Sequence, residues 1–294
     1  MKLKFLAFLI LIASLSVNSF AQENLAYNDT SYFIPYDDDF NFIMSASRGH
    51  LFNVKSLLER GADINAVTVD GITALMYAAD NGDLEMIRFL VEKGANPDVQ
   101  PYNGVTALMS AAQQNHFQIT EFLAVKGAKL DLQDERGITA LHYAAAYNHF
   151  EIVDMLIFYG ANKELKDRKG NTPLITASFN NCYESVEVLI ENEANVNAND
   201  NKGFTPLMAA LEENNDKIAY FLINEGANIK KENNGGITAL AIAVKEGNYE
   251  MTESLIENGA NVNHSVGLSQ NILELAKAQN DSEIKELLLD HGAT

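Results

Sequence analysis

Three of the six histidines and the only cysteine stand at one recurring position of the 294-residue chain. Side chains of these types can bind zinc or attack a substrate. They are His50, His116, His149 and Cys182, and they follow one another at multiples of one constant interval. Zinc ligands must converge at one point, whereas residues that recur at long equal intervals belong to successive structural units. The segment around the cysteine, NNCYES, contains no base or cation that would activate the thiol. We therefore expect structural roles for all four residues.

Other patterns that accompany catalysis are missing from the sequence. It contains no phosphate-binding glycine loop, no nucleophile elbow and no spaced set of zinc ligands. The triplet Asp37-Asp38-Asp39 could attract a cation, but an isolated acidic triplet more often starts a helix or lies in a solvated loop. We expect a protein that is not an enzyme and holds no cofactor or metal. Catalysis is the alternative to which we give the least weight.

One phrase returns along the chain and indicates repeated structural units. GITALMYAA at 71–79 comes back as GITALHYAA at 137–145, and GITAL returns at 236–240. One fixed period is kept without insertion by Gly71, Gly104, Gly137, Gly170, Gly203 and Gly236. Two rows with this period run through eight units: Ala62, Ala95, Ala128, Ala161, Ala194, Ala227, Ala260 and Ala293, and Leu57, Leu90, Leu123, Leu156, Leu189, Leu222, Leu255 and Leu288. A linear stack of like units explains such repetition.

Each unit is expected to contain two short helices, a turn between them and a loop. The row from Phe42 to Leu273 opens the first helix, and a row of small residues three positions later lets neighbouring helices approach closely. Only Gly or Asn follows, as at Gly49 and Asn115, which is typical of a left-handed turn that ends a helix. The second helix stops at glycine. The polar stretch after it favours an extended hairpin.

Glu193 interrupts the row of glycines that ends the second helices. The other seven units have glycine immediately before the conserved alanine. If the backbone keeps a left-handed turn at this position, a residue with a Cβ costs roughly 1–2 kcal/mol there. The sequence thus predicts a weak joint in the fifth unit.

These units resemble the ankyrin repeat family over about 257 of the 294 residues. The family phrase T-P-L-H stands as TAL or TPL at 73–75, 106–108, 139–141, 172–174, 205–207 and 238–240, and only His142 fills its histidine position. The resemblance implies an all-α fold, an ankyrin-repeat solenoid of about eight helix-turn-helix-hairpin units, with hairpin fingers near its concave side. Loss of the histidine in the other units should remove a polar contact between neighbours and leave the packing pattern intact.

We expect three segments along the chain. Residues 1–21 are interpreted as a signal peptide, 22–37 as a tail or as a strap over the first unit, and 38–294 as the ankyrin repeat domain, with units near 38–70, 71–103, 104–136, 137–169, 170–202, 203–235, 236–268 and 269–294. The first and last units lack the GxT phrase, and polar outer faces on terminal units keep a stack soluble.

The first residues have the three regions of a secretory signal peptide. In MKLKFLAFLILIASLSVNSFAQ, Lys2 and Lys4 precede an apolar run from Phe5 to Val17, and Ser19-Phe20-Ala21 fits the cleavage pattern. The run is shorter than the roughly 18 to 20 residues that span a bilayer, although an uncleaved anchor helix is the rival interpretation. We expect an exported protein, periplasmic or secreted, with no membrane span after removal of the leader. A signal peptide combined with such repeats favours a bacterial source.

The formal net charge of −19 bears on possible partners. A strongly acidic surface repels nucleic acid and anionic lipid and speeds encounters with basic proteins. We therefore predict that the chain binds another protein, for which a basic protein is one possibility, and that it does not bind nucleic acid. The alternative is that the acidic residues only keep an elongated monomer soluble. Cys182 has no second cysteine with which to form an internal disulfide, so stability must come from packing.

The resemblance also implies which residues meet a partner, because the family uses its finger tips and the exposed edge of its first helices. The finger positions are Tyr102, Asn103, Glu135, Arg136, Arg168, Lys169, Asn201 and Lys202, and the helix positions are Tyr77, Asp80, Gln113, Gln114, Tyr143, Tyr147, Phe179, Glu212 and Glu213. Tyr and Phe are favoured anchors in protein interfaces. For Tyr77 and Tyr143 the alternative is partial core packing.

The sequence thus favours a non-catalytic protein–protein interaction module whose rigidity limits the ordering entropy lost on binding. Two narrower interpretations stay open. One is an inhibitor or immunity protein that neutralises a basic toxin or enzyme, for which the negative charge would speed association. The other is a protective or assembly factor for a periplasmic enzyme.

Overall fold

A computed structural model describes residues 37–266 and 270–294. The expected signal peptide and residues 22–36 of the expected tail or strap lie outside the described residues. Residues Asp38–Thr294 form one compact unit.

Sixteen helices occupy the described part of the chain, in eight pairs, so the expected all-α repeat fold is confirmed. The first helices of the pairs are α2 (Asp38–Ser47), α4 (Ala74–Asp80), α6 (Ala107–Gln113), α8 (Ala140–Ala146), α10 (Pro173–Phe179), α12 (Pro206–Glu212), α14 (Ala239–Lys245) and α16 (Ile272–Ala278). The second helices are α3 (Leu51–Glu59), α5 (Leu84–Glu92), α7 (Phe117–Val125), α9 (Phe150–Phe158), α11 (Tyr183–Glu191), α13 (Asp216–Asn224), α15 (Tyr249–Glu257) and α17 (Ser282–Asp290). A two-stranded antiparallel pair, β1 (Ser265–Val266) and β2 (Gln270–Asn271), precedes α16.

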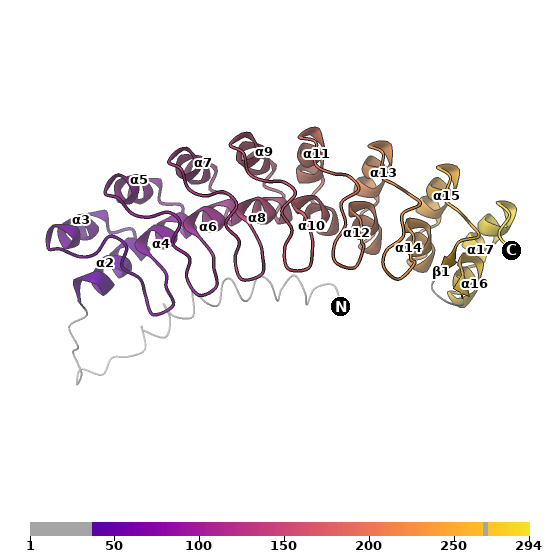
Figure 1. Ribbon diagram of the computed structural model, residues 1–294, viewed down its shortest axis with the longest axis horizontal. Helices are drawn as coiled ribbons and strands as arrows, with labels where there is room; N and C mark the ends of the chain where they lie inside the picture. Colours follow the sequence, from indigo (N-terminus) through magenta and orange to yellow (C-terminus); the bar gives the residue numbers. More distant parts are fainter. Residues whose placement is uncertain (1–36, 267–269) are drawn as a thin grey trace. The chain divides into compact units, whose positions relative to one another are not determined.

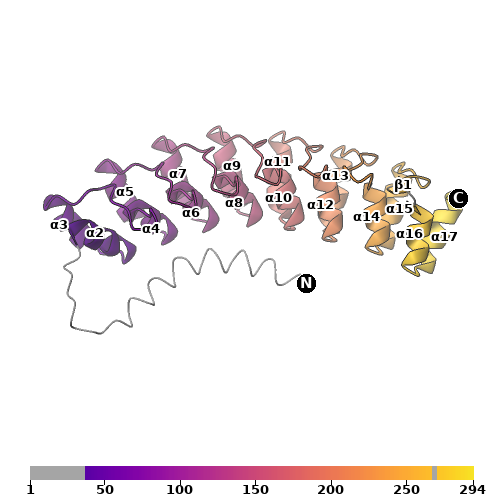
Figure 2. The ribbon, with the colours of Figure 1, turned by 60° about the horizontal axis from the view of Figure 1, so that its bottom comes forward.

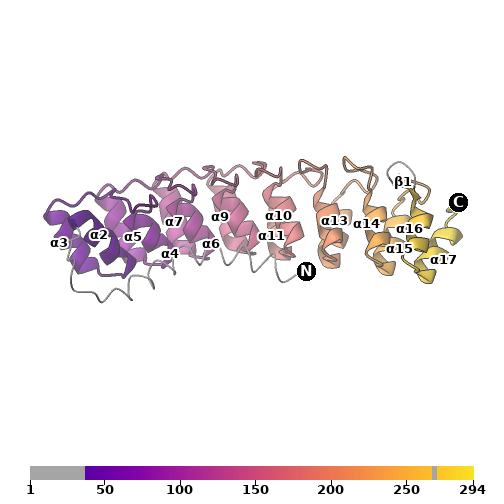
Figure 3. The same cartoon turned by 90° about the horizontal axis from the view of Figure 1, so that it is seen from below.

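The pairs stand in chain order in a single row (Figures 1 and 3). Figure 2 shows the first helices beside one another, each packed between the first helices of the units before and after it, as α6 is between α4 and α8. The second helices form a parallel row on the side away from the fingers (Figure 1). Each unit therefore has its main apolar contacts with its neighbours and not with a central nucleus.

Local sequence sets the limits of the helices. Threonine caps the first helix of units two to seven, as where the Thr73 side chain accepts a hydrogen bond from the Met76 N–H. The next turn is left-handed, with φ of 61° at Asn115 and 75° at Gly82, as the Gly/Asn row predicts. In the first unit, Asp38 and Asp39 lie in the first turn of α2, where acidic side chains stabilise a helix.

Two rows of residues make the core. The small residues of the first helices, such as Ala78 and Ala111, are fully buried, and so are the second-helix leucines Leu90, Leu123 and Leu156. Small side chains at the first-helix contacts let the helices approach closely, and the leucines fill the space between the two layers.

Glu193 has the left-handed backbone conformation that the glycines at the same position of the other units predict. Its φ is 60°, and φ is 96° at Gly160 and 83° at Gly226. We expect Glu193→Gly to raise the free energy of unfolding by about 1 kcal/mol, because the substitution removes the steric cost of a Cβ in this region. Thermal unfolding followed by circular dichroism measures the change. An unchanged or lower melting temperature in the variant would contradict the prediction.

Candidate functional site

The four fingers from the third to the sixth unit are each closed by a short set of hydrogen bonds around one polar residue. In the third unit the Asp134 N–H donates to the Ile138 carbonyl at 2.9 Å, and the Asp134 carboxylate accepts from the Arg136 and Ile138 N–H groups, both at 2.8 Å. Asp167, Asp200 and Asn233 do the same in the next three units. This periodic row of Asp and Asn is a sequence signal for the clasp in addition to the rows described above.

The finger tips are joined to one another through the backbone. At five successive joints a tip N–H donates to a carbonyl of the preceding tip, at 2.8–3.3 Å: Tyr102 to Asp70, Glu135 to Asn103, Arg168 to Arg136, Asn201 to Lys169 and Asn234 to Lys202. These bonds hold the tips at a constant spacing, and the side-chain amides of Asn201 and Asn234 reinforce them by donating to the Arg168 and Asn201 carbonyls at 3.0 and 2.9 Å. The fingers therefore form a continuous, stiff edge.

All eight residues predicted for the finger tips are exposed. Tyr102 is 77% exposed, more than any other tyrosine in the described part of the chain. The other exposed predicted tip residues are Asn103, Glu135, Arg136, Arg168, Lys169, Asn201 and Lys202. From the third to the fifth unit the tips thus carry more positive than negative side chains, although the chain as a whole is acidic.

Side-chain contacts connect the first-helix edges of neighbouring units. The Gln113 amide lies 3.3 Å from the Tyr147 hydroxyl, and the Gln114 amide donates to the Asp80 carboxylate at 2.9 Å. The Tyr147 ring also stacks on the His149 ring, with 6.0 Å between centroids. Tyr147 and Phe179 remain 38% and 39% exposed, so both present ring surface at the ends of their first helices.

The two tyrosines with alternative interpretations differ from each other. Tyr143 is only 6% exposed, and its hydroxyl donates to the Asp134 carboxylate at 3.0 Å and accepts from Arg136 at 2.5 Å. Burial, followed by the charge of Asp134, raises the pKa of this phenol. Tyr143 thus belongs to the core and to the finger clasp, and its side chain is not presented to a partner. Tyr77 is half-buried, and burial likewise raises its pKa.

The row of histidine and cysteine residues links consecutive units. His116 and His149 each donate from Nε2 to a carbonyl at the end of the preceding first helix, Asp80 O at 3.1 Å and Gln113 O at 3.0 Å. The Cys182 thiol makes the corresponding contact with Ala146 O at 3.3 Å, and the Asn215 amide does so with Ser178 O at 2.8 Å. Burial raises the pKa of the Cys182 thiol to about 11, so the group is neutral and unreactive near pH 7.

His142, the family histidine, is fully buried and also joins two units. Its Nδ1 lies 2.8 Å from the Thr139 hydroxyl, and its Nε2 donates to the Asn171 carbonyl in the next unit at 3.0 Å. Burial lowers the pKa of the imidazole, which keeps it neutral. The polar contact expected at this position is present, and the buried methionines Met76, Met109 and Met208 fill the same place in other units.

Side chains that bind metal ions do not gather at one point in the described ranges. Residues 37–266 and 270–294 contain no group of three His, Cys, Asp or Glu side chains that could hold a metal ion. In the same ranges, every helix falls short of the length and apolar character that a bilayer span requires. The acidic triplet takes part in ordinary contacts: Asp38 pairs with Arg60 at 2.6 Å, and Asp39 accepts from the Asp63 N–H at 2.7 Å.

Comparison with protein families finds a match along most of the repeat region. The model of a family described as ankyrin repeats (3 copies) matches residues 42–134, 119–200, 141–233 and 196–266. No curated protein matches the chain.

Proposed function

Because this chain belongs to the ankyrin repeat family, we propose that it is a non-catalytic module that binds another protein along its fingers and first-helix edges. Members of the family are typically interaction scaffolds. The specific surface proposed here consists of the exposed finger residues and the ring surfaces of Tyr147 and Phe179, and we call it the finger surface.

The main support for this proposal is the row of finger tips joined by backbone hydrogen bonds. Tyr102 stands in that row with 77% of its surface exposed, and its own backbone N–H is held by Asp70 O at 3.3 Å. A side chain on a backbone that is already ordered loses little further entropy when a partner covers it. Large aromatic residues in such positions supply much of the binding energy of protein interfaces.

The net charge of the chain and the local charge of the finger tips have opposite signs, and they favour different interactions with a partner. The net charge of −19 favours fast encounter with a basic partner, which also fits an inhibitor of a basic enzyme or toxin. The exposed tips with Arg136, Arg168 and Lys202 instead favour local contacts with acidic side chains of that partner. Binding steered by the overall charge should weaken as salt rises.

We also propose export of the protein, with residues 1–21 acting as the signal peptide. Lys2 and Lys4 before the apolar run support this proposal, and the mature chain would act as a monomer in the periplasm or outside the cell.

A pull-down from the native envelope fraction tests the finger surface. We expect Tyr102→Ala/Tyr147→Ala to bind its prey ~100-fold more weakly than the unaltered chain, since interface aromatics commonly contribute a few kcal/mol when truncated. Recovered proteins are identified by mass spectrometry, and the affinity of the main prey is then measured in solution.

Phe158→Ala is the matched control. Phe158 is also aromatic and 81% exposed, but it ends α9 in the row of second helices, on the side away from the fingers (Figure 1). This control should recover the same prey as the unaltered chain. Equal recovery by the double variant would rule out the finger surface as the binding site.

A further inference from the structure

A ladder of side-chain oxygens closes the joints between neighbouring units at the base of the fingers. At six joints a side-chain oxygen accepts the backbone N–H 31 residues later, at 2.7–3.0 Å: Asn65 from Asn96, Asp98 from Lys129, Asp131 from Asn162, Glu164 from Asn195, Asn197 from Asn228 and Asn263 from Thr294. Asn, Asp and Glu all occur in the row, so the common requirement is an oxygen acceptor. The ladder holds the start of each finger to the preceding unit.

Lys230 interrupts this ladder. It occupies the acceptor position of the sixth unit, and an ammonium group has only donors. The corresponding N–H, that of Asn261, finds no acceptor among residues 37–266 and 270–294. Where the other joints bring a donor and an acceptor together, this joint brings together two donors.

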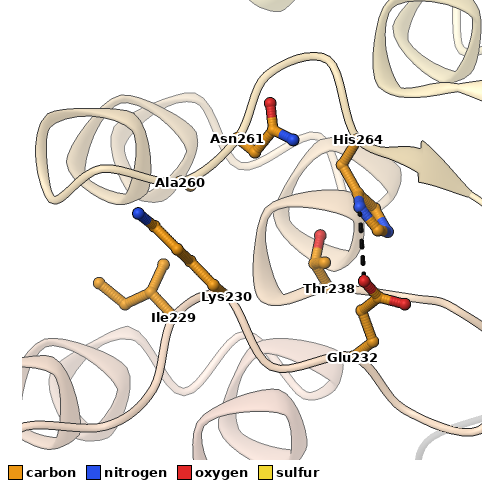
Figure 4. Close-up of a pocket in the computed structure, with 7 residues that line it drawn as sticks. All are labelled: Ile229, Lys230, Glu232, Thr238, Ala260, Asn261 and His264. Atoms are coloured by element: carbon orange, nitrogen blue, oxygen red, sulfur yellow. Dashed lines mark ion pairs between the residues drawn. The ribbon is translucent and has the colours of Figure 1, made fainter.

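A pocket of about 200 Å³ lies at this joint (Figure 4). It is lined by Ile229, Lys230, Glu232, Thr238, Ala260, Asn261 and His264. Figure 4 shows the Lys230 side chain extended along one wall toward Ala260, with His264 and Glu232 at the opposite side. The volume is several times the roughly 30 Å³ that one water occupies in the liquid, so it accommodates a small functional group.

Three other polar side chains line the pocket, and one of them, Thr238, has a hydroxyl proton to donate. The Thr238 hydroxyl accepts from the Ala241 N–H at 3.3 Å, which leaves its proton for donation. His264 donates from Nε2 to the Gly236 carbonyl at 2.9 Å, and its Nδ1 faces the Glu232 carboxylate at 3.8 Å. Glu232 is thus the one acidic side chain among the lining residues, and it lies against the imidazole on the wall away from Lys230.

We propose that this pocket binds a carboxylate. One carboxylate oxygen takes the place that the ladder oxygens occupy elsewhere and accepts from the Asn261 N–H, and the other pairs with the Lys230 ammonium. Charge-assisted hydrogen bonds of this kind are the stronger ones in proteins. The negative charge of Glu232 limits the affinity. The site does not depend on the finger surface, because its donors lie at the base of the fingers between the sixth and seventh units.

Two sources can supply the carboxylate, and the probes separate them. The ¹⁵N-labelled full chain is titrated with acetate, with N-acetylglycine as the mimic of a peptide C-terminus, and with N-acetylglycinamide as the neutral control. We expect a saturable shift of the Asn261 amide resonance with the two acids and none with the amide. Tighter binding of N-acetylglycine indicates a peptide terminus as the natural ligand, and equal affinity indicates a small free carboxylic acid.

Two variants of Lys230 test the role of the missing acceptor. Lys230→Asn restores the residue type of Asn65, Asn197 and Asn263; we expect it to abolish the titration and to raise the melting temperature by about 2–4 °C through the restored hydrogen bond. Lys230→Met removes the charge without providing an oxygen acceptor. It should weaken carboxylate binding about tenfold or more, and it should not raise the melting temperature as Lys230→Asn does. Glu232→Gln should strengthen binding.

The proposal is overturned if the Asn261 resonance of the unaltered chain does not shift saturably with either acid. It is equally overturned if Lys230→Asn binds acetate as the unaltered chain does. Both outcomes are independent of the pull-down with the finger surface, because the probes are isolated small molecules.

Discussion

Gly137→Ala is expected to lower the free energy of unfolding by about 3 kcal/mol. Gly137 has φ of 79°, and a Cβ there would lie 2.8 Å from the Arg168 nitrogen and 3.0 Å from the Asp167 carbonyl carbon. The left-handed backbone costs roughly 1–2 kcal/mol with a Cβ, and overpacking against a backbone that cannot move aside costs about 1–3 kcal/mol. The clash falls on the joint where the Arg168 N–H donates to the Arg136 carbonyl at 2.9 Å.

Gly127→Ala separates the two contributions. Gly127 has φ of 88°, but a Cβ there would meet no atom within 4 Å. Only the conformational cost should appear, about 1 kcal/mol. Urea unfolding followed by circular dichroism gives both values. If the two alanine variants were equally stable, close approach of the neighbouring finger would not be the reason for glycine at position 137.

Asp134→Ala is expected to cost about 3 kcal/mol, because one buried carboxylate holds the third finger closed. Asp134 is 6% exposed and accepts hydrogen bonds from the Arg136 backbone, the Arg136 guanidinium at 2.9 Å and the Tyr143 hydroxyl at 3.0 Å. Alanine would leave buried donors without an acceptor, and each such donor costs roughly 1–3 kcal/mol. The free energy of unfolding of the full chain measures the loss.

Asp134→Asn is the matched control, since Asn233 closes the sixth finger with the same two backbone contacts, from Gly235 at 2.9 Å and from Ile237 at 3.0 Å. The amide keeps the backbone acceptor but weakens the contact with the Arg136 guanidinium, so about 1 kcal/mol should be lost. If Asp134→Asn lowered the free energy of unfolding as much as Asp134→Ala, the stabilisation would come from the Arg136 ion pair. That result would contradict the role proposed for the backbone hydrogen bonds of the finger.

Much of the fold could be predicted because each unit repeats the same short-range sequence features. The Gly/Asn turn, the threonine caps and the leucine row act within one unit or with its nearest neighbour, and they recur with the period of the glycine row. The left-handed conformation of Glu193 followed from the same register. The structural role of Cys182 and of the histidine row was also predictable, because residues at equal long intervals cannot converge on one centre.

The candidate site was predictable only as a set of positions. Tyr143 and Tyr147 belong to the same short segment, yet Tyr143 is 6% exposed and Tyr147 is 38% exposed. The difference depends on Asp134 and Arg136, which form a polar pocket for one hydroxyl through the geometry of the finger. Sequence spacing indicates which residues share a face, but not which of them a neighbouring finger covers.

The sequence by itself determined the number of units, their two helices and the turns that separate them, because these features follow from backbone preferences and from apolar rows of fixed period. Only the tertiary structure decided what happens at the joints. A Cβ at Gly137 would meet the backbone of the next finger at Arg168, and Lys230 and Asn261 line one pocket from two successive units. Such contacts depend on the distance and rotation between successive units, which are set by how the side chains of two units pack together and not by the preferences of either one alone.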